Sequence, residues 1–262
     1  MTVSPAFSRR PLTTQHLAGL PIAVFSDLAN QIAYGNEPAG NWRVGFYRTK
    51  VRVQTWWYDL WRYWLIDGFL ERQIVFWLKR YLKPGVVLEV GTGDGRLMRH
   101  IPRTSTYWGF DVFIREDVAR MANAQGNCHL FVASATKLPL PDRSVDYLIS
   151  TEVLEHVTGP TQAIREMARV TKPGGLAFIT IPNNYCYKYQ RKGPHPEHVN
   201  NWSYRDFMAA MAPYFRVIEG RMTGYWLPWF PRLRYSYQLP ISHPDERFNS
   251  NFLFAFERID AR

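Results

Sequence analysis

From Val86 onward, short apolar runs alternate with segments in which apolar residues recur at helical spacing. The short runs are rich in β-branched and aromatic residues and predict strands, and the amphipathic segments between them predict helices. This alternation is typical of an α/β fold with a Rossmann-like parallel sheet and helices on both faces. The expected strands are 86–90, 107–112, 129–134, 144–150 and 175–182, and the expected helices lie within 93–101, 114–124 and 160–171.

The last third of the chain follows a different pattern. It predicts a helix over 203–213, a strand over 214–222 and a final strand over 251–259. An aromatic, proline-rich insert without a regular period separates the last two strands. We expect 185–202 and 221–250 to form insert or lid elements beside the sheet.

The first 84 residues differ from the rest. Residues 1–50 mix Pro, Gly and Asn with short apolar pieces and suggest an irregular arm with one short helix. Residues 53–83 carry aromatic residues at helical spacing and predict one long helix, or two hinged at Gly68. We expect these aromatics to pack on the sheet, with a membrane-surface or substrate-lid role as the alternative. The sequence thus divides into an N-terminal arm and helical cap, 1–84, and an α/β domain, 85–262.

Composition supports a globular chain. Of 262 residues, 46% are hydrophobic, and no tract is long and uncharged enough to span a bilayer. The first residues lack the apolar core of a signal peptide, and two cysteines do not make a disulfide framework. We therefore expect a soluble, cytoplasmic protein.

The net charge of +10 is unevenly distributed. Residues 85–185 are neutral, whereas 1–84 carry an excess of +6 and 186–262 an excess of +4. If the basic flanks cover a neutral core, the substrate experiences the positive field. A solvated basic surface that aids solubility explains the same charge.

The stretch VVLEVGTGDGRL, residues 86–97, indicates the ligand. A glycine-rich turn after a first strand lets a ligand approach the backbone closely. The spacing is G-x-G-x-G, without the Lys-Ser/Thr of a P-loop, and Glu89 and Asp94 would repel a pyrophosphate. Asp111 ends the next expected strand, where a carboxylate can accept both ribose hydroxyls, although it could instead cap the helix that follows. Adenosine with a cationic amino-acid tail and no phosphate is S-adenosylmethionine.

Four segments in order, LEVGTGDG, GFDV, ATKLPLPDRSVDYLISTEVLEHV and EMARVTKPGGLAFITIPN, give a wider resemblance. Over about 100 residues the chain resembles the class I S-adenosylmethionine-dependent methyltransferases, closest to the ubiquinone/menaquinone-type and small-molecule subgroup. The resemblance implies a seven-stranded sheet whose last strand is antiparallel. It also implies cofactor-binding roles for Glu89, Gly91, Thr92, Gly93, Gly95, Asp111, Val112, Ser134, Ala135, Thr151 and Glu152. Ser134 stands where the family usually has an acid for the adenine amino group, so this contact loses charge assistance.

The expected chemistry is methyl transfer to a small-molecule hydroxyl, assisted by a base. His156, after the fourth expected strand, and His198, after the fifth, are the candidate catalytic residues, with His195 a weaker one. A structural bond from His156 to backbone is the alternative. We expect no metal, because His195, Glu197 and His198 have no third ligand nearby in the sequence.

Aromatic flanks with scattered arginines favour an acidic, aromatic or sugar-bearing small molecule. A lipid or quinone precursor, with loose membrane-surface contact, fits as well. RNA is disfavoured, because the segment after the fourth strand reads STEVLEHV rather than Asn/Asp-Pro-Pro-Tyr/Phe, and the basic residues form no compact cluster. A protein that binds S-adenosylmethionine without turnover stays open, whereas the glycine spacing and Glu89 oppose a nicotinamide-dependent reductase.

Overall fold

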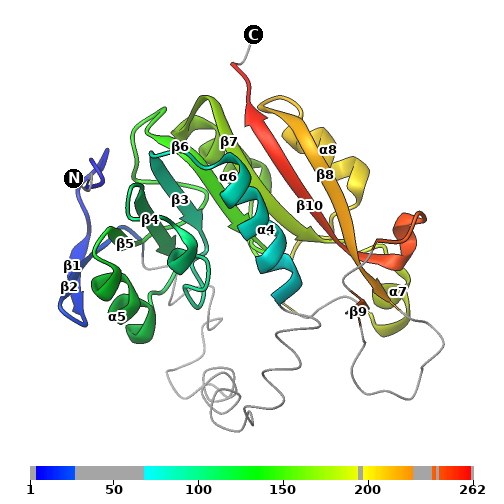
Figure 1. Cartoon of the computed structure of the whole chain (residues 1–262), viewed down its shortest axis with the longest axis horizontal. Helices are drawn as coiled ribbons and strands as arrows, with labels where there is room; N and C mark the ends of the chain where they lie inside the picture. Colours follow the sequence, from blue (N-terminus) through cyan, green and yellow to red (C-terminus); the bar gives the residue numbers. More distant parts are fainter. Residues whose placement is uncertain (1–3, 27–67, 194–196, 227–237, 240–241, 261–262) are drawn as a thin grey trace, which may run out of the picture.

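The computed structural model describes residues 4–26, 68–193, 197–226, 238–239 and 242–260. Over this part of the chain, ten strands form one sheet in the order β1-β2-β5-β4-β3-β6-β7-β10-β8-β9 (Figure 1). The strands are β1 Thr13–Leu17, β2 Leu20–Val24, β3 Val86–Val90, β4 Thr106–Asp111, β5 Cys128–Val132, β6 Val145–Thr151, β7 Thr171–Pro182, β8 Phe215–Trp226, β9 Gln238–Leu239 and β10 Asn249–Arg258. The helices are α4 Gly68–Tyr81, α5 Glu116–Gln125, α6 Pro160–Val170, α7 Tyr187–Lys192 and α8 Tyr204–Met211, with short 3-10 helices η2 Met98–His100 and η3 Glu246–Phe248.

Within the sheet, the seven neighbouring strands β5-β4-β3-β6-β7-β10-β8 have the expected arrangement. β5, β4, β3, β6 and β7 are parallel, and β10 runs antiparallel between β7 and β8. The α/β fold with an antiparallel last strand is therefore confirmed. Parallel strands bring their carboxyl ends to one edge of the sheet, where ligands bind in such folds.

The N-terminal edge of the sheet was not foreseen. Instead of an irregular arm, Thr13–Val24 forms the hairpin β1–β2, and β2 pairs in parallel with β5. Its two-residue turn, Ala18-Gly19, has positive φ at both positions, as a tight hairpin requires. Ile22 and Val24 are buried, so apolar burial fixes the hairpin on the sheet. The division at residue 84 stays a prediction, and the rest of the arm, 27–67, lies outside the described residues.

Helices cover both faces of the sheet, α4 and α5 on one and α6 and α8 on the other (Figure 1). In α4, Ile74, Trp77 and Leu78 are buried, and the Trp77 ring stacks on Phe178 of β7 with centroids 6.0 Å apart. For the described part of the aromatic segment, packing on the sheet is thus confirmed.

One expected helix is much shorter than predicted. Of 93–101, only Met98–His100 is helical, as a single 3-10 turn. Gly95 has a left-handed φ of +72° and Pro102 follows closely, which leaves too few residues for an α-helix. The glycine loop therefore lacks the helix N-terminus that attracts phosphates.

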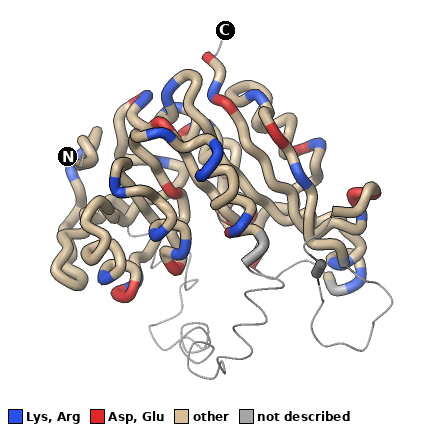
Figure 2. The backbone as a smooth tube through the Cα atoms, in the orientation of Figure 1, with Lys and Arg blue, Asp and Glu red and all other residues tan. Residues whose placement is uncertain are grey.

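Basic and acidic residues are interspersed along the described backbone (Figure 2). The aromatic insert expected near the C-terminus falls partly outside the described residues, at 227–237 and 240–241. No helix within the described ranges is long and apolar enough to cross a membrane.

Candidate functional site

The loop that follows β3 turns back over the end of β4. The amides of Gly91 and Thr92 both donate to the carbonyl oxygen of Phe110, at 2.9 and 3.0 Å. Gly91 and Gly93 have positive φ angles of +78° and +51°, a backbone conformation that is unfavourable for residues with a Cβ. A Cβ at Gly91 would lie 2.5 Å from Cγ2 of Val153, whereas one at Gly93 would have no described atom within 4 Å. The loop is closely packed at Gly91 and open at Gly93.

Asp111 joins the end of β4 to this loop. Its Oδ2 accepts from the Gly93 amide at 2.9 Å, and its Oδ1 accepts from the Val112 amide at 2.7 Å. Burial raises the pKa of the Asp111 carboxyl, and these backbone amides act in the opposite direction. Each carboxylate oxygen can accept one further hydrogen bond. The N-cap of α5 is Arg115, so Asp111 does not cap that helix and is available for a diol.

Glu89 lies beneath the loop rather than in it. Its side chain is buried in β3, and the Tyr107 hydroxyl donates to its Oε2. Burial raises the pKa of Glu89 to about 8. Its described side-chain contact is therefore internal, and its expected role at the cofactor stays a prediction.

The segment that follows β5 lies beside Asp111, because the Ala133 amide donates to the Asp111 carbonyl oxygen at 3.1 Å. The hydroxyl of Ser134 lies 2.8 Å from that of Thr136 and accepts from the Thr136 amide at 3.2 Å. Ala135 is buried. Ser134 and Ala135 thus follow a residue that is bonded to Asp111, and their expected contact with adenine stays a prediction.

The end of β6 carries a strained acidic residue. Glu152 has φ of +53°, and its amide donates to the Thr180 carbonyl oxygen. Its carboxyl accepts from the Thr180 hydroxyl at 2.9 Å and from the Asn251 amide at 3.0 Å. Burial raises the pKa of Glu152 to about 7. Thr151 pairs with Thr180 in the sheet, so both residues expected on the methyl-transfer side lie at this edge.

Four residues after Glu152, the chain reaches His156, which lies against the second candidate histidine, His198. The rings of His156 and His198 have centroids 5.0 Å apart, at an interplanar angle of 82°. His156 Nδ1 lies 2.9 Å from the Glu197 carbonyl oxygen, so this nitrogen donates and Nε2 keeps its lone pair. Beside them, Glu155 is 1% exposed. His195 lies outside the described residues.

This edge of the sheet suits the ligand that the sequence predicts. The space at Gly93 is open close to the backbone, and the Asp111 carboxylate keeps acceptor positions of the kind that a vicinal diol uses. Arg96, the basic residue of the loop, is bound to Asp94 at 2.5 Å. Without a helix N-terminus at the loop, the site favours an adenosine that carries no pyrophosphate.

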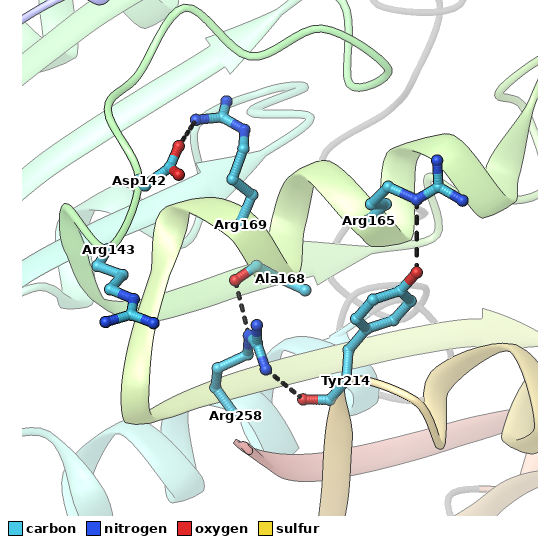
Figure 3. A pocket seen from close by; sticks show the side chains of 7 residues that line it. All are labelled: Asp142, Arg143, Arg165, Ala168, Arg169, Tyr214 and Arg258. Atoms are coloured by element: carbon cyan, nitrogen blue, oxygen red, sulfur yellow. Dashed lines mark hydrogen bonds and ion pairs between the residues drawn. The ribbon is translucent and has the colours of Figure 1, made fainter. Parts of the chain in front are cut away.

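A cavity of about 220 Å³ lies at the opposite edge of the sheet, near the amino end of β6 and the carboxyl end of β10 (Figure 3). Its guanidinium groups have partners within the protein. Arg169 binds Asp142, and Arg258 donates to the Ala168 and Tyr214 carbonyl oxygens. Arg258 of β10 therefore holds α6 and the residue before β8 against the last strand. The lining residues are Asp142, Arg143, Arg165, Ala168, Arg169, Tyr214 and Arg258.

Comparison with known proteins agrees with this geometry. The model of the family described as methyltransferase domain matches residues 88–179. An uncharacterized methyltransferase of Mycobacterium bovis is 33% identical over 180 residues, which are 60% of this chain and 70% of that protein. A probable S-adenosylmethionine-dependent methyltransferase of Mycobacterium tuberculosis is 30% identical over 143 residues, 52% of this chain and 48% of its own. The chain spans about half or less of the length of several curated relatives that it matches.

Solved structures show the same fold at low identity. An S-adenosylmethionine-dependent methyltransferase of Thermotoga maritima has a TM-score of 0.53 and 20% identity, covering 76% of this chain and 93% of its own. The [4+2]-cyclase SpnF has a TM-score of 0.55 and 16% identity, covering 73% and 81%. The fold thus also occurs in a protein named for another reaction.

Sequence reasoning overlooked Glu155 and the side chains that hold Glu152. Glu152-x-x-Glu155-His156 is a visible signal, because it places three ionisable groups just after a parallel strand. Thr180 and Asn251 carry no such signal, since only the pairing of β7 with β10 brings them to Glu152.

Proposed function

We infer the function from the family: the chain belongs to the class I S-adenosylmethionine-dependent methyltransferases, and we propose that it methylates a hydroxyl oxygen of a small molecule. S-adenosylmethionine, when bound, supplies a methyl group on a positively charged sulfur. The acceptor oxygen forms a bond to that methyl carbon while the sulfur–methyl bond breaks. The sulfur keeps the electron pair, and the hydroxyl proton passes to a base of the protein.

The glycine loop and Asp111 are the proposed cofactor site. Gly91, Thr92 and Gly93 lie against the amino-acid tail, and Asp111 accepts the ribose hydroxyls through the acceptor positions that its backbone bonds leave. Val112, Ser134 and Ala135 lie toward the adenine, whereas Gly95, Thr151, Glu152 and the buried Glu89 complete the proposed set.

The observation that carries the proposal is the contact between this loop and the segment after β6. We call Glu152, Glu155 and the two histidines beside them, His156 and His198, the acidic cluster. Gly91 packs on Val153, which lies between Glu152 and the segment of Glu155 and His156. An acceptor bound at His156 would therefore lie next to the loop that holds the donor. Such proximity is the main requirement of an in-line displacement.

His156 and His198 are the proposed catalytic residues. The hydrogen bond from His156 Nδ1 to a carbonyl fixes the ring, and the lone pair on Nε2 can accept the hydroxyl proton. The acceptor that we favour is an acidic, aromatic or sugar-bearing molecule, because scattered arginines and aromatic residues flank the neutral core.

The test has two stages. Calorimetric titration with S-adenosylhomocysteine should give micromolar binding, and NADH should give none. Release of S-adenosylhomocysteine during incubation with fractionated small-molecule extracts should then fall in His156→Ala and His198→Ala. His16→Ala, on the exposed hairpin, is the matched control. Binding without release from any fraction would leave a cofactor-binding protein without turnover and refute the proposal.

A further inference from the structure

Glu155 is the least satisfied acid in the described structure. Its side chain is 1% exposed, and neither carboxyl oxygen has a hydrogen-bond partner among the described residues. A buried carboxyl without a hydrogen-bond donor is strongly disfavoured in its ionised form. Side chains of this kind are satisfied by protonation or by a bound cation.

Two imidazoles converge on this acid. One ligand atom each from Glu155, His156 and His198 lies within 4.8 Å of the other two. His156 Nε2 is 3.9 Å from Glu155 Oε1, beyond hydrogen-bond distance. Ligands about 2.1 Å from one metal ion are separated by at most about 4.2 Å. Small side-chain movements would therefore bring all three atoms onto a single ion.

The two imidazoles have hydrogen-bond partners of the kind that metal-bound histidines usually have. Such histidines donate their second ring N–H to a carbonyl or carboxylate, which fixes the ring and its tautomer. His156 Nδ1 has this bond to the Glu197 carbonyl oxygen at 2.9 Å. His198 Nδ1 lies 3.1 Å from the amide nitrogen of Asn184, whose oxygen is buried and lacks a partner in the described part of the chain. Rotating that amide by half a turn would place its oxygen against His198 Nδ1, which would then donate to it.

The backbone holds the two ligand-bearing segments together. The amides of Val199 and Asn200 donate to the Glu155 carbonyl oxygen at 2.9 and 3.0 Å. The Asn200 side chain also donates to the carbonyl oxygens of Leu154 and Val157, at 2.9 and 2.6 Å. Five hydrogen bonds, with that of His156, thus fix residues 197–200 against residues 154–157. The two segments that carry the three side chains are thus held together before any ion arrives.

We propose that Glu155, His156 and His198 bind one divalent transition-metal ion, of the type of Mn²⁺ or Zn²⁺. Two imidazoles and a carboxylate favour such ions over Ca²⁺, which prefers oxygen ligands alone. The proposal departs from the expectation of no metal, which considered His195, Glu197 and His198. Of that group, His198 supplies a ligand here and Glu197 contributes only its backbone carbonyl.

Three protein ligands leave coordination positions for an acceptor. This consequence rests on the proposed function. A hydroxyl bound to the ion loses its proton more readily, because a divalent cation strongly lowers the pKa of a coordinated oxygen. In the loaded protein the imidazoles serve as ligands, the ion lowers the pKa of the bound hydroxyl, and the released proton passes to solvent water. The role of His156 as a base then belongs to the metal-free protein.

The experiment uses the whole chain after removal of metals with EDTA and dialysis. Titration with Mn²⁺, followed by the loss of the free-ion electron paramagnetic resonance signal, should show one saturable site. Glu155→Gln keeps the side-chain shape and should weaken Mn²⁺ binding by at least about 100-fold, since even loss of a supporting residue costs 10- to 100-fold. His198→Ala should do the same. Glu116→Gln, on the exposed side of α5, is the matched control and should bind Mn²⁺ like the wild type.

Folding is checked independently by circular dichroism and by S-adenosylhomocysteine affinity, which Glu155→Gln should leave unchanged. Equal Mn²⁺ affinity in the wild type and Glu155→Gln, or no saturable binding at all, would overturn the metal site. Methyl transfer that survives EDTA would overturn the role of the ion in the reaction. Saturable Mn²⁺ binding in a protein without methyl transfer would support the site and refute the proposed function, so the two failures are distinguishable.

Discussion

Replacing Gly91 and Gly93 separately by alanine tests how the glycine loop is built. Both residues have a left-handed backbone, with φ of +78° and +51°. Their surroundings differ, because a methyl group at Gly91 would lie 2.5 Å from Val153 Cγ2 and one at Gly93 would extend into space without a described neighbour within 4 Å. The two substitutions therefore share the conformational strain but differ in steric overlap.

The magnitudes follow from these two contributions. Left-handed backbone costs a residue with a Cβ about 1–2 kcal/mol, and overpacking against a fixed neighbour adds about 1–3 kcal/mol. Gly91→Ala should thus lower the free energy of unfolding by about 2–5 kcal/mol and Gly93→Ala by only about 1–2 kcal/mol. The order reverses for binding, because the methyl group at Gly93 would occupy space that we assign to the cofactor.

Urea unfolding measures the first effect and calorimetric titration with S-adenosylhomocysteine the second. Val153→Ala should relieve the overlap, so a double-mutant cycle with Gly91→Ala should give a favourable coupling of about 1–3 kcal/mol. Gly93→Ala should lose only about 1–2 kcal/mol of stability and bind S-adenosylhomocysteine more weakly. Equal stability of the two variants, or no coupling with Val153, would refute the steric reasoning.

Three further predictions concern other parts of the fold. Asp111→Ala should weaken S-adenosylhomocysteine binding by about 10- to 100-fold, because hydrogen bonds to a charged group contribute about 1.5–3 kcal/mol; unchanged affinity in the titration would contradict the ribose assignment. Trp77→Ala should cost about 3–5 kcal/mol in urea unfolding, since the ring is fully buried on Phe178; a loss below about 1 kcal/mol would contradict this packing. The pKa of Glu89 is raised from 4.5 to about 8 in the folded state, so its contribution to stability is fully present below pH 4.5 and is lost as the pH rises toward 8. Unfolding measured over this range should therefore show a smaller fall of stability with pH in Glu89→Gln than in the wild type, and parallel curves would count against the shift.

The sequence predicts the parallel part of the sheet well because burial there depends on local pattern. Strands such as Val86–Val90 are covered on both faces and appear as short continuous apolar runs. The hairpin at Thr13–Val24 escaped notice because its first strand is exposed and polar, so it shows little apolar pattern. The helix at 93–101 was predicted too long from the spacing of its apolar residues, whereas Gly95 and Pro102 end regular structure locally.

The residues of the candidate site likewise fall into those that the sequence predicts and those that only the fold brings together. Positions close together in the chain, such as Gly91 and Gly93, can be read from the sequence because a single turn contains them. The cluster at His156 and His198 depends on a contact between segments 42 residues apart, held by backbone hydrogen bonds that leave no mark in composition. Glu155 could be noticed in the sequence, but its burial could not.

A strained residue connects the two halves of this site. Glu152 adopts a left-handed backbone conformation, which costs a residue with a Cβ about 1–2 kcal/mol. Such strain persists only where the surrounding structure enforces it. Here β7 and β10 enforce it, through two bonds with Thr180 and one with Asn251. The turn that results places Val153 against Gly91 and leads directly to Glu155. Because one backbone turn sets both contacts, the cofactor loop and the acidic cluster are positioned as a single unit.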